Sequence, residues 1–381
     1  MAAKKYLFAP GPTPVPPQVL AAMAEPIVHH RAADFRAVYE RCLARLREVF
    51  RTEQDVLLFT ASGTGAMESA VANLCDPGDP VLVVAAGGFG ERWAQIARAY
   101  GADLDVLEVE WGETPSADEI AARLAARPAK AVFCQQSETS TGVVSDVRAF
   151  AAAAHDAGAL IVVDAISSLG AVPLETDAWG IDVVLSGSQK ALMTPPGLAM
   201  ATVSEAAWER LGSGPRFYFD WRRTRESQGK LDSPFTPAIS LVAGLDVALG
   251  LLLETGLEAA FAQHARLGRA CREGVKAMGL ELFSPDEDRS AVVTAVRSPD
   301  GIDSGDLLKL LNERYGITLA PGQGRLKGKA FRIGHIGWYD VFDITTALAA
   351  LELALAELGA EIERGVAVTC ALDAFAEPVT A

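Results

Sequence analysis

The stretch DVVLSGSQKALMTPPG at residues 182–197 decides how this chain folds. Its apolar residues 183–185 predict a buried strand, and the small residues 186–188 predict a tight turn that presents Lys190. No acidic residue adjoins Lys190 in the sequence, so its amine can lose a proton and act as a nucleophile toward an aldehyde. Taken alone, the run is better interpreted as an exposed loop lysine, and the rest of the chain has to decide.

The composition is that of a soluble globular protein with two domains. The chain has 381 residues, of which 50% are apolar and 22% are charged, and its formal net charge of −15 excludes a basic nucleic-acid footprint and a cationic membrane-binding face. The five cysteines are widely spaced without a CxxC pair, which argues for a reducing compartment and against a metal site. No apolar leader opens the chain, and the most apolar stretch, 241–253, is too short to span a bilayer. We therefore expect a cytoplasmic protein that binds neither nucleic acid nor a membrane.

Apolar strands and amphipathic helices alternate along the first two thirds of the chain. We expect strands at 56–60, 81–85, 104–108, 131–134, 159–164, 183–186 and 199–203. This alternation is typical of βαβ units, so it predicts an α/β fold with a mainly parallel sheet covered by helices. Helices expected at 240–253, 257–278, 303–315 and 341–358, with strands at 291–296 and 330–333, indicate a smaller C-terminal α+β domain.

The same pattern divides the chain into four parts. Residues 1–20 form an arm whose prolines at 10–17 disfavour a sheet strand, so that it either lines a pocket, lies over a partner subunit or is a loose terminus. A large domain is expected at 21–250 and a small domain at 251–365. Residues 366–381 show no clear periodicity and are expected to form a tail.

Polar signals follow the predicted strands, at the sheet edge where ligands of parallel sheets gather. Ser62-Gly63-Thr64-Gly65 offers backbone amides, a helix N-terminus and two hydroxyls to a phosphate, although a plain turn fits as well. Asp164 ends an apolar strand, where it either pairs with a protonated pyridine nitrogen or caps the next helix. The run Glu138–Gly142 offers the hydroxyl of Thr139, but an ordinary loop is the simpler interpretation.

Two further side chains suit a flat ring and an anion. Phe89, flanked by glycines in GGFGER at 87–92, either stacks on a ring or packs in the core. Arg332, inside the apolar strand 330–333, either holds a substrate carboxylate with two prongs or forms a structural ion pair. Together with Lys190, these signals point to pyridoxal phosphate (PLP), whose aldehyde, ring nitrogen and phosphate each require one of them.

From Pro10-Gly11-Pro12 to the strand of Arg332, the chain resembles the class V aminotransferases of PLP fold type I, and among them the alanine–glyoxylate and serine–glyoxylate (serine–pyruvate) group. The resemblance is most specific in DAISSLG at 164–170 and in SGSQKAL with PPG at 186–197. It implies that Lys190 forms the Schiff base with PLP and shuttles the proton, while Asp164 holds the ring nitrogen. It further implies PLP contacts from Ser62, Gly63, Thr64, Phe89, Thr139, Ile166 and Gln189, a substrate site at Arg332 and Gly11, and a homodimer in which Thr236 reaches the phosphate of the neighbouring subunit.

The implied activity is a ping-pong transfer of an amino group from a small amino acid, serine or alanine, to glyoxylate or pyruvate. A PLP lyase of the cysteine desulfurase type is less favoured, because it needs a cysteine near the substrate arginine and none lies between Cys271 and Cys370. A phosphoserine aminotransferase-like activity, suggested by His30-Arg31, stays open. So does a protein that binds PLP without turnover, as a binding or regulatory module.

Overall fold

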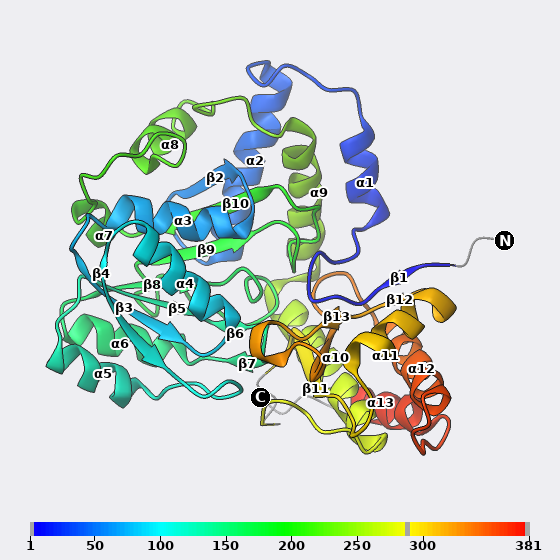
Figure 1. Cartoon of the computed structure of the whole chain (residues 1–381). Helices are drawn as coiled ribbons and strands as arrows, with labels where there is room; N and C mark the ends of the chain where they lie inside the picture. Colours follow the sequence, from blue (N-terminus) through cyan, green and yellow to red (C-terminus); the bar gives the residue numbers. More distant parts are fainter. Residues whose placement is uncertain (1–3, 286–289, 378–381) are drawn as a thin grey trace.

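The structure is a computed structural model that describes residues 4–285 and 290–377 (Figure 1). Within them, the central sheet has seven strands in the order β2-β10-β9-β8-β5-β3-β4. Their bounds are β2 Val56–Thr60, β10 Leu198–Val203, β9 Val183–Gly187, β8 Leu160–Asp164, β5 Ala131–Gln135, β3 Pro80–Ala85 and β4 Asp103–Glu108. Only β10 runs against its neighbours β9 and β2, and the pairs from β9 to β4 are parallel. The predicted mainly parallel sheet is confirmed, and the other six strands end at one edge.

Side chains alternate between the two faces of this sheet. In β8, Ile161 and Val163 pack in one core cluster, whereas Leu160 and Val162 pack in another, as the period of two in a strand requires. Both faces are covered by helices, which explains why the central strands are apolar throughout (Figure 1). The first cluster includes side chains from helices α2 Ala33–Phe50, α5 Ala117–Ala126, α6 Val147–Asp156 and α9 Ile239–Thr255. The second includes side chains from helices α3 Gly63–Leu74 and α4 Gly88–Ala99.

The C-terminal part has its own antiparallel sheet and core cluster. The sheet has the order β11-β14-β13, with β11 Val293–Arg297, β14 Ala330–Gly334 and β13 Ala320–Pro321. The helices around it are α10 Leu257–Ala277, α11 Ser304–Leu310 with a π-helical continuation at Leu311–Tyr315, and α12 Val341–Glu357. Near the N-terminus, β1 Tyr6–Leu7 pairs in parallel with β12 Ile317–Thr318, so the arm runs from this part toward the large sheet (Figure 1).

Most predicted elements lie within one to three residues of the observed ones. Helix α5 begins with a capping box formed by Ser116 and Glu119. Three short helices were not predicted: α1 Pro17–Ala24, α7 Glu205–Glu209 and α8 Trp221–Gln228. None exceeds eight residues, which is too short for a helical period to repeat clearly. The remaining short elements are β6 Ser137–Glu138, β7 Val143–Val144 and a 3-10 turn at Gly324–Leu326.

The expectation of a tail from residue 366 is wrong for most of its length. Helix α13, Val366–Ala376, packs against α10 through the buried side chains of Ala367, Ala371 and Ala374. A face made of alanines produces little contrast in hydropathy, which is why the sequence showed no period there. Residues 378–381 lie outside the described residues, and the boundaries at 20, 250 and 365 stay predictions.

In the part of the chain that the structure describes, no single helix has the length and apolar character needed to cross a membrane. Helices α9 and α10 satisfy that test only as a pair, bent by 87°.

Candidate active site

Lys190 lies just beyond β9, at the carboxyl edge of the central sheet, and is only 9% exposed. Its Nζ donates to the carbonyl oxygen of Pro10, so the proline-rich arm lines the space around this lysine. Gly11 has a φ of +142°, and a side chain there would overlap the Lys190 ammonium. Burial lowers the pKa of Lys190 to about 8, and the positive charges of Arg332 and Arg92 act in the same direction. A fraction of this amine is therefore neutral near pH 7.

Asp164 ends β8, the strand beside β9, and is 5% exposed. One carboxylate oxygen accepts the backbone N–H of Ile166 at 2.8 Å. Burial raises the pKa of Asp164 to about 7, and the negative charge of Glu138 adds to the rise, whereas Arg92 and Lys190 oppose it. In the described part of the chain, no cationic side chain lies within 4.0 Å of this carboxylate to compensate its burial.

The turn between β2 and α3 meets the turn that carries Lys190. A Cβ on Gly63 would lie 2.6 Å from Cδ1 of Ile166, and a Cβ on Gly187 would lie 3.5 Å from the backbone N of Gly63. Ser62, the N-cap of α3, forms no side-chain cap, and the first turn of this helix holds no acidic residue. The first backbone amides of α3 are therefore open to an anion.

Arg332 projects from the middle of β14 and is 4% exposed. Its Nε and Nη2 donate to the carbonyl oxygen of Pro321 at 3.1 and 3.0 Å, and its Nη1 donates to the carbonyl oxygen of Thr139 at 2.9 Å. Among the described residues, no carboxylate lies within 4.0 Å of this guanidinium, so the structural ion pair considered as the alternative is absent. Burial lowers the pKa of Arg332 to about 10.

Phe89 lies in the first turn of α4, next to the start of α3. The guanidinium of Arg92 covers one face of the Phe89 ring, 4.8 Å from its centroid. The same guanidinium donates to Oγ1 of Thr64 at 3.1 Å. Arg92 therefore ties the aromatic ring to the turn at the start of α3.

Several buried polar atoms at this sheet edge have no hydrogen-bond partner within residues 4–285 and 290–377. They belong to the amide of Gln135, which ends β5 opposite Asp164, to the hydroxyl of Ser186 in β9, and to Oε1 of Gln189. Buried polar groups are almost always paired, so such a group of unpaired atoms is typical of a site that is completed by a ligand.

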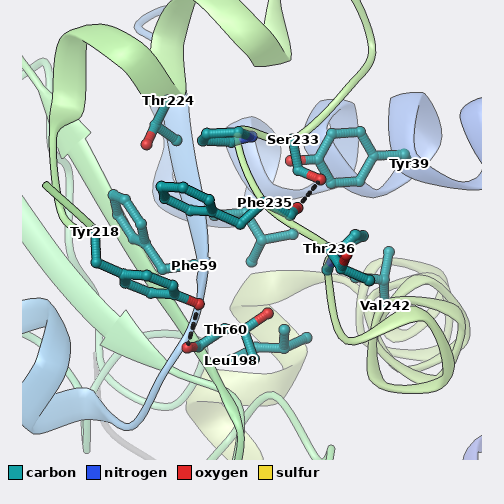
Figure 2. A pocket seen from close by; sticks show the side chains of 13 residues that line it. Tyr39, Phe59, Thr60, Leu198, Tyr218, Thr224, Ser233, Phe235, Thr236 and Val242 are labelled. Carbon is teal, nitrogen blue, oxygen red and sulfur yellow. Dashed lines mark hydrogen bonds between the residues drawn. The ribbon is translucent and has the colours of Figure 1, made fainter. Parts of the chain in front are cut away.

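Thr236 lies apart from the other predicted residues and is exposed. It lines a small cavity of about 30 Å³ beside β2, together with Phe235 and Tyr218 (Figure 2). Tyr218 stacks on Phe235 with ring centroids 5.1 Å apart, and its hydroxyl donates to the carbonyl oxygen of Thr60 at 3.3 Å. Among the described residues of one chain, no hydrogen bond joins Thr236 to Lys190 or to Asp164.

Two side chains at this edge were not assigned a role from the sequence. No contact was predicted for Arg92, although it follows Phe89 by three residues, which is the spacing of neighbours on a helix. Glu138 was named only as the first residue of a loop, but it is fully buried and accepts four hydrogen bonds. The signal for Glu138 was weaker than that for Asp164, because the three polar residues at 135–137 separate it from the apolar strand at 131–134.

Comparison with known proteins identifies the family of the chain. The family model of aminotransferase class V matches residues 5–326. The chain is 41% identical to the soluble hydrogenase 42 kDa subunit of Anabaena cylindrica, over 98% of this chain and 99% of that protein. It is 37% identical to the serine–glyoxylate aminotransferase of Methylorubrum extorquens, over 97% and 95% of the two chains.

Among solved structures, the ureidoglycine–glyoxylate aminotransferase of Bacillus subtilis superposes with a TM-score of 0.94 at 32% identity, and 99% of each chain is covered. The family match spans most of the chain, and the fold agrees over its whole length. The chain therefore belongs to the class V aminotransferases, which are PLP-dependent transaminases of fold type I.

Proposed function

We propose that this transaminase moves an amino group from serine or alanine to glyoxylate, with pyruvate as a weaker acceptor. The observation that carries the proposal is Arg332, a buried cation without a carboxylate partner among the described residues. An arginine has five N–H groups, and three of those on Arg332 bond to carbonyl oxygens. One N–H on each terminal nitrogen remains, and a carboxylate can accept both at once.

The residues at the sheet edge fit PLP. We assign the ring nitrogen to Asp164, a carboxylate whose pKa is raised by burial and which a protonated ring nitrogen would stabilise. The open amides of α3, with the side chains of Ser62, Thr64 and Gln189, suit the phosphate.

The two faces of the PLP ring and its hydroxyl group would be contacted by three more side chains. Ile166 and Phe89 are assigned to the faces of the ring, and Thr139 to its hydroxyl. The support for Ile166 is its contact with Gly63, and for Phe89 its link to Thr64 through Arg92.

When bound, PLP withdraws electrons from the amino acid and so makes its Cα proton acidic. With PLP in place, Lys190 would be the base that takes this proton from the amino acid and releases it again during the transfer. A pKa of about 8 keeps the amine close to the pH of the cell, where a base both accepts and releases a proton efficiently. The carbonyl oxygen of Pro10 fixes the position of Nζ, and Arg332 orients the substrate through its α-carboxylate.

The preference for substrates with one carboxylate follows from the remaining arginines. Arg31 pairs with Asp232 at 3.0 Å, Arg325 pairs with Glu91 at 3.3 Å, and Arg92 bonds to Thr64. Arg92 holds no carboxylate but is engaged by Oγ1 of Thr64 and the Phe89 ring, so a substrate with a distal carboxylate would have to break these contacts or bury its second charge unpaired, which is costly.

No observation favours the lyase reaction. Such a lyase needs an exposed thiolate near Arg332, but Cys42, Cys75, Cys134 and Cys271 are buried, and Cys370 lies on α13. Burial raises the pKa of each of the four buried thiols. The name of the Anabaena relative does not change the proposal, since the described residues contain no group of three side chains that could hold a metal ion.

We further propose that the protein is a cytoplasmic homodimer. Phe217 and Tyr218, next to Phe235, are 67% and 43% exposed, and aromatic rings that large are commonly covered by a partner. In such a dimer, we propose that Thr236 contacts the cofactor phosphate of the neighbouring subunit. Cysteines without disulfides support a reducing compartment.

One experiment tests the substrate assignment. The purified, PLP-loaded protein is assayed with serine, alanine and aspartate as amino donors, each with glyoxylate, pyruvate and 2-oxoglutarate as acceptors. We expect serine or alanine with glyoxylate to give the highest kcat/KM. If 2-oxoglutarate is the best acceptor, the model of a single carboxylate clamp is wrong.

A further inference from the structure

The first turn of α4 is capped by side chains from a distant segment. A helix leaves its first backbone amides without partners inside the helix. In α4 these are the amides of Gly88, Phe89 and Gly90, and each has a partner. Phe89 and Gly90 donate to one carboxylate oxygen of Glu138 at 3.0 and 3.1 Å, and Gly88 donates to Oγ of Ser140 at 2.9 Å.

Ser140 belongs to the same cap. Its hydroxyl donates to the second carboxylate oxygen of Glu138 at 2.5 Å, and its backbone N–H donates to that oxygen at 3.1 Å. Glu138 thus accepts four hydrogen bonds, two on each oxygen, and is fully buried. Burial raises the pKa of Glu138, and the four hydrogen bonds, three of them from backbone N–H groups, act in the opposite direction and favour the carboxylate.

The glycines of the GGFG motif make room for this carboxylate. A Cβ on Gly87 would lie 2.6 Å from both Cγ and Cδ of Glu138. A Cβ on Gly90 would lie 2.6 Å from the carbonyl oxygen of Val84 and would push α4 away from β3. Glycines at these two positions let the helix start against the sheet with Glu138 beneath its first turn.

The neighbouring helix α3 differs from α4 in that no carboxylate caps its N-terminus. Its N-cap Ser62 makes no side-chain cap, and no acidic residue lies in its first turn. Both helices begin at the same edge of the sheet, and both N-termini attract anions. The chain fills the N-terminus of α4 with its own carboxylate and leaves that of α3 free.

We propose that Glu138 is a positioning residue that holds Phe89 against the PLP ring and reserves the N-terminus of α3 as the place for the phosphate. Arg92 completes the arrangement from the other side, because it covers the Phe89 ring and bonds to Thr64 in the first turn of α3. Glu138 acts on the backbone of Phe89, and Arg92 acts on its ring. This inference rests on the proposed cofactor site.

The test uses Glu138→Gln in the PLP-loaded protein. Glutamine keeps the size of the side chain, but its NH₂ group would face the backbone N–H of Ser140. Both groups are donors, so this hydrogen bond would be lost. We expect faster hydrogen exchange of the amides at 88–90 and a changed visible circular dichroism spectrum of the bound cofactor. The release of PLP should be roughly three- to tenfold faster, which corresponds to the free energy of one lost aromatic contact.

A double variant shows whether Glu138 acts through Phe89. If it does, Glu138→Gln adds little to the rate of PLP release once Phe89→Ala has removed the ring. The matched control is Glu352→Gln, since Glu352 is a buried glutamate that accepts the amides of Gly365 and Ala367 at 2.8 Å each, at the start of α13. That variant should unfold more easily but release PLP at the wild-type rate.

Two results would overturn the proposal. One is an equal effect of Glu138→Gln on PLP release with and without the Phe89 ring, and the other is an effect no larger than that of Glu352→Gln. If Glu138→Gln does not fold, Ser140→Ala removes only the contact to Gly88 and the hydroxyl bond, and the same measurements apply. Failure of the wild-type protein to bind PLP would instead refute the proposed function.

Discussion

Replacing Asp164 with asparagine should make the cofactor-free protein more stable at pH 8 while it removes transaminase activity. Asparagine has the same shape and keeps an oxygen that can accept the Ile166 amide, a bond of 2.8 Å in the structure. It carries no charge, so its burial avoids the cost of desolvating a carboxylate. Activity is lost because asparagine cannot stabilise a protonated ring nitrogen.

The magnitude follows from the pKa of the buried carboxyl. Burial raises the pKa of Asp164 from 3.8 to about 7, so between these values the folded protein binds a proton that the unfolded chain has released. Stability therefore falls as the pH rises from 3.8 to about 7, and the whole cost is present above pH 7. At 1.36 kcal/mol for each pKa unit, Asp164→Asn should raise the free energy of unfolding at pH 8 by at most about 4 kcal/mol.

The assay is urea unfolding of both cofactor-free proteins at pH 4 and at pH 8, at the same protomer concentration, since assembly shifts apparent stability. We expect the variant to be more stable at pH 8 and the difference to disappear near pH 4, where the folded wild type holds a neutral carboxyl. A variant that is less stable at pH 8, or a difference that is the same at both pH values, would refute the reasoning.

Three other variants test the site. Borohydride should attach PLP irreversibly to Lys190, as peptide mapping will show, and Lys190→Ala should lose turnover with an unchanged far-UV circular dichroism spectrum; a label on another lysine would contradict the assignment. Arg332→Lys should raise KM for every substrate roughly 10- to 100-fold, because an ammonium cannot make the two-pronged contact, and an unchanged KM would argue against the clamp. Gly11→Ala should displace the Lys190 amine and lower kcat, whereas wild-type kcat would mean that the arm can move aside.

The candidate site could be predicted in part, because one topological rule places the ends of parallel strands together. Lys190 and Asp164 each follow an apolar run, and the neighbouring strands β9 and β8 carry them to the same edge. Their roles, and that of Thr236, remain predictions that the variants above will test.

The elements themselves were determined by local patterns in the sequence. The strand at 56–60 was predicted with its observed bounds and the helix at 257–278 to within one residue, because hydrophobic periodicity depends only on residues a few positions apart. For the same reason, α13 was missed, since its buried face consists of alanines.

Only the tertiary structure decided how charges and helix ends are paired. Glu138 caps α4 from 48 and 49 residues away, and Arg332 bonds to Thr139 across 193 residues instead of forming an ion pair. The contacts of Arg92 with the Phe89 ring and with Oγ1 of Thr64 were likewise visible only in the tertiary structure. Hydrogen bonds and charges act between atoms that are close in space, and a linear sequence does not record which distant residues folding brings within 3 Å of each other.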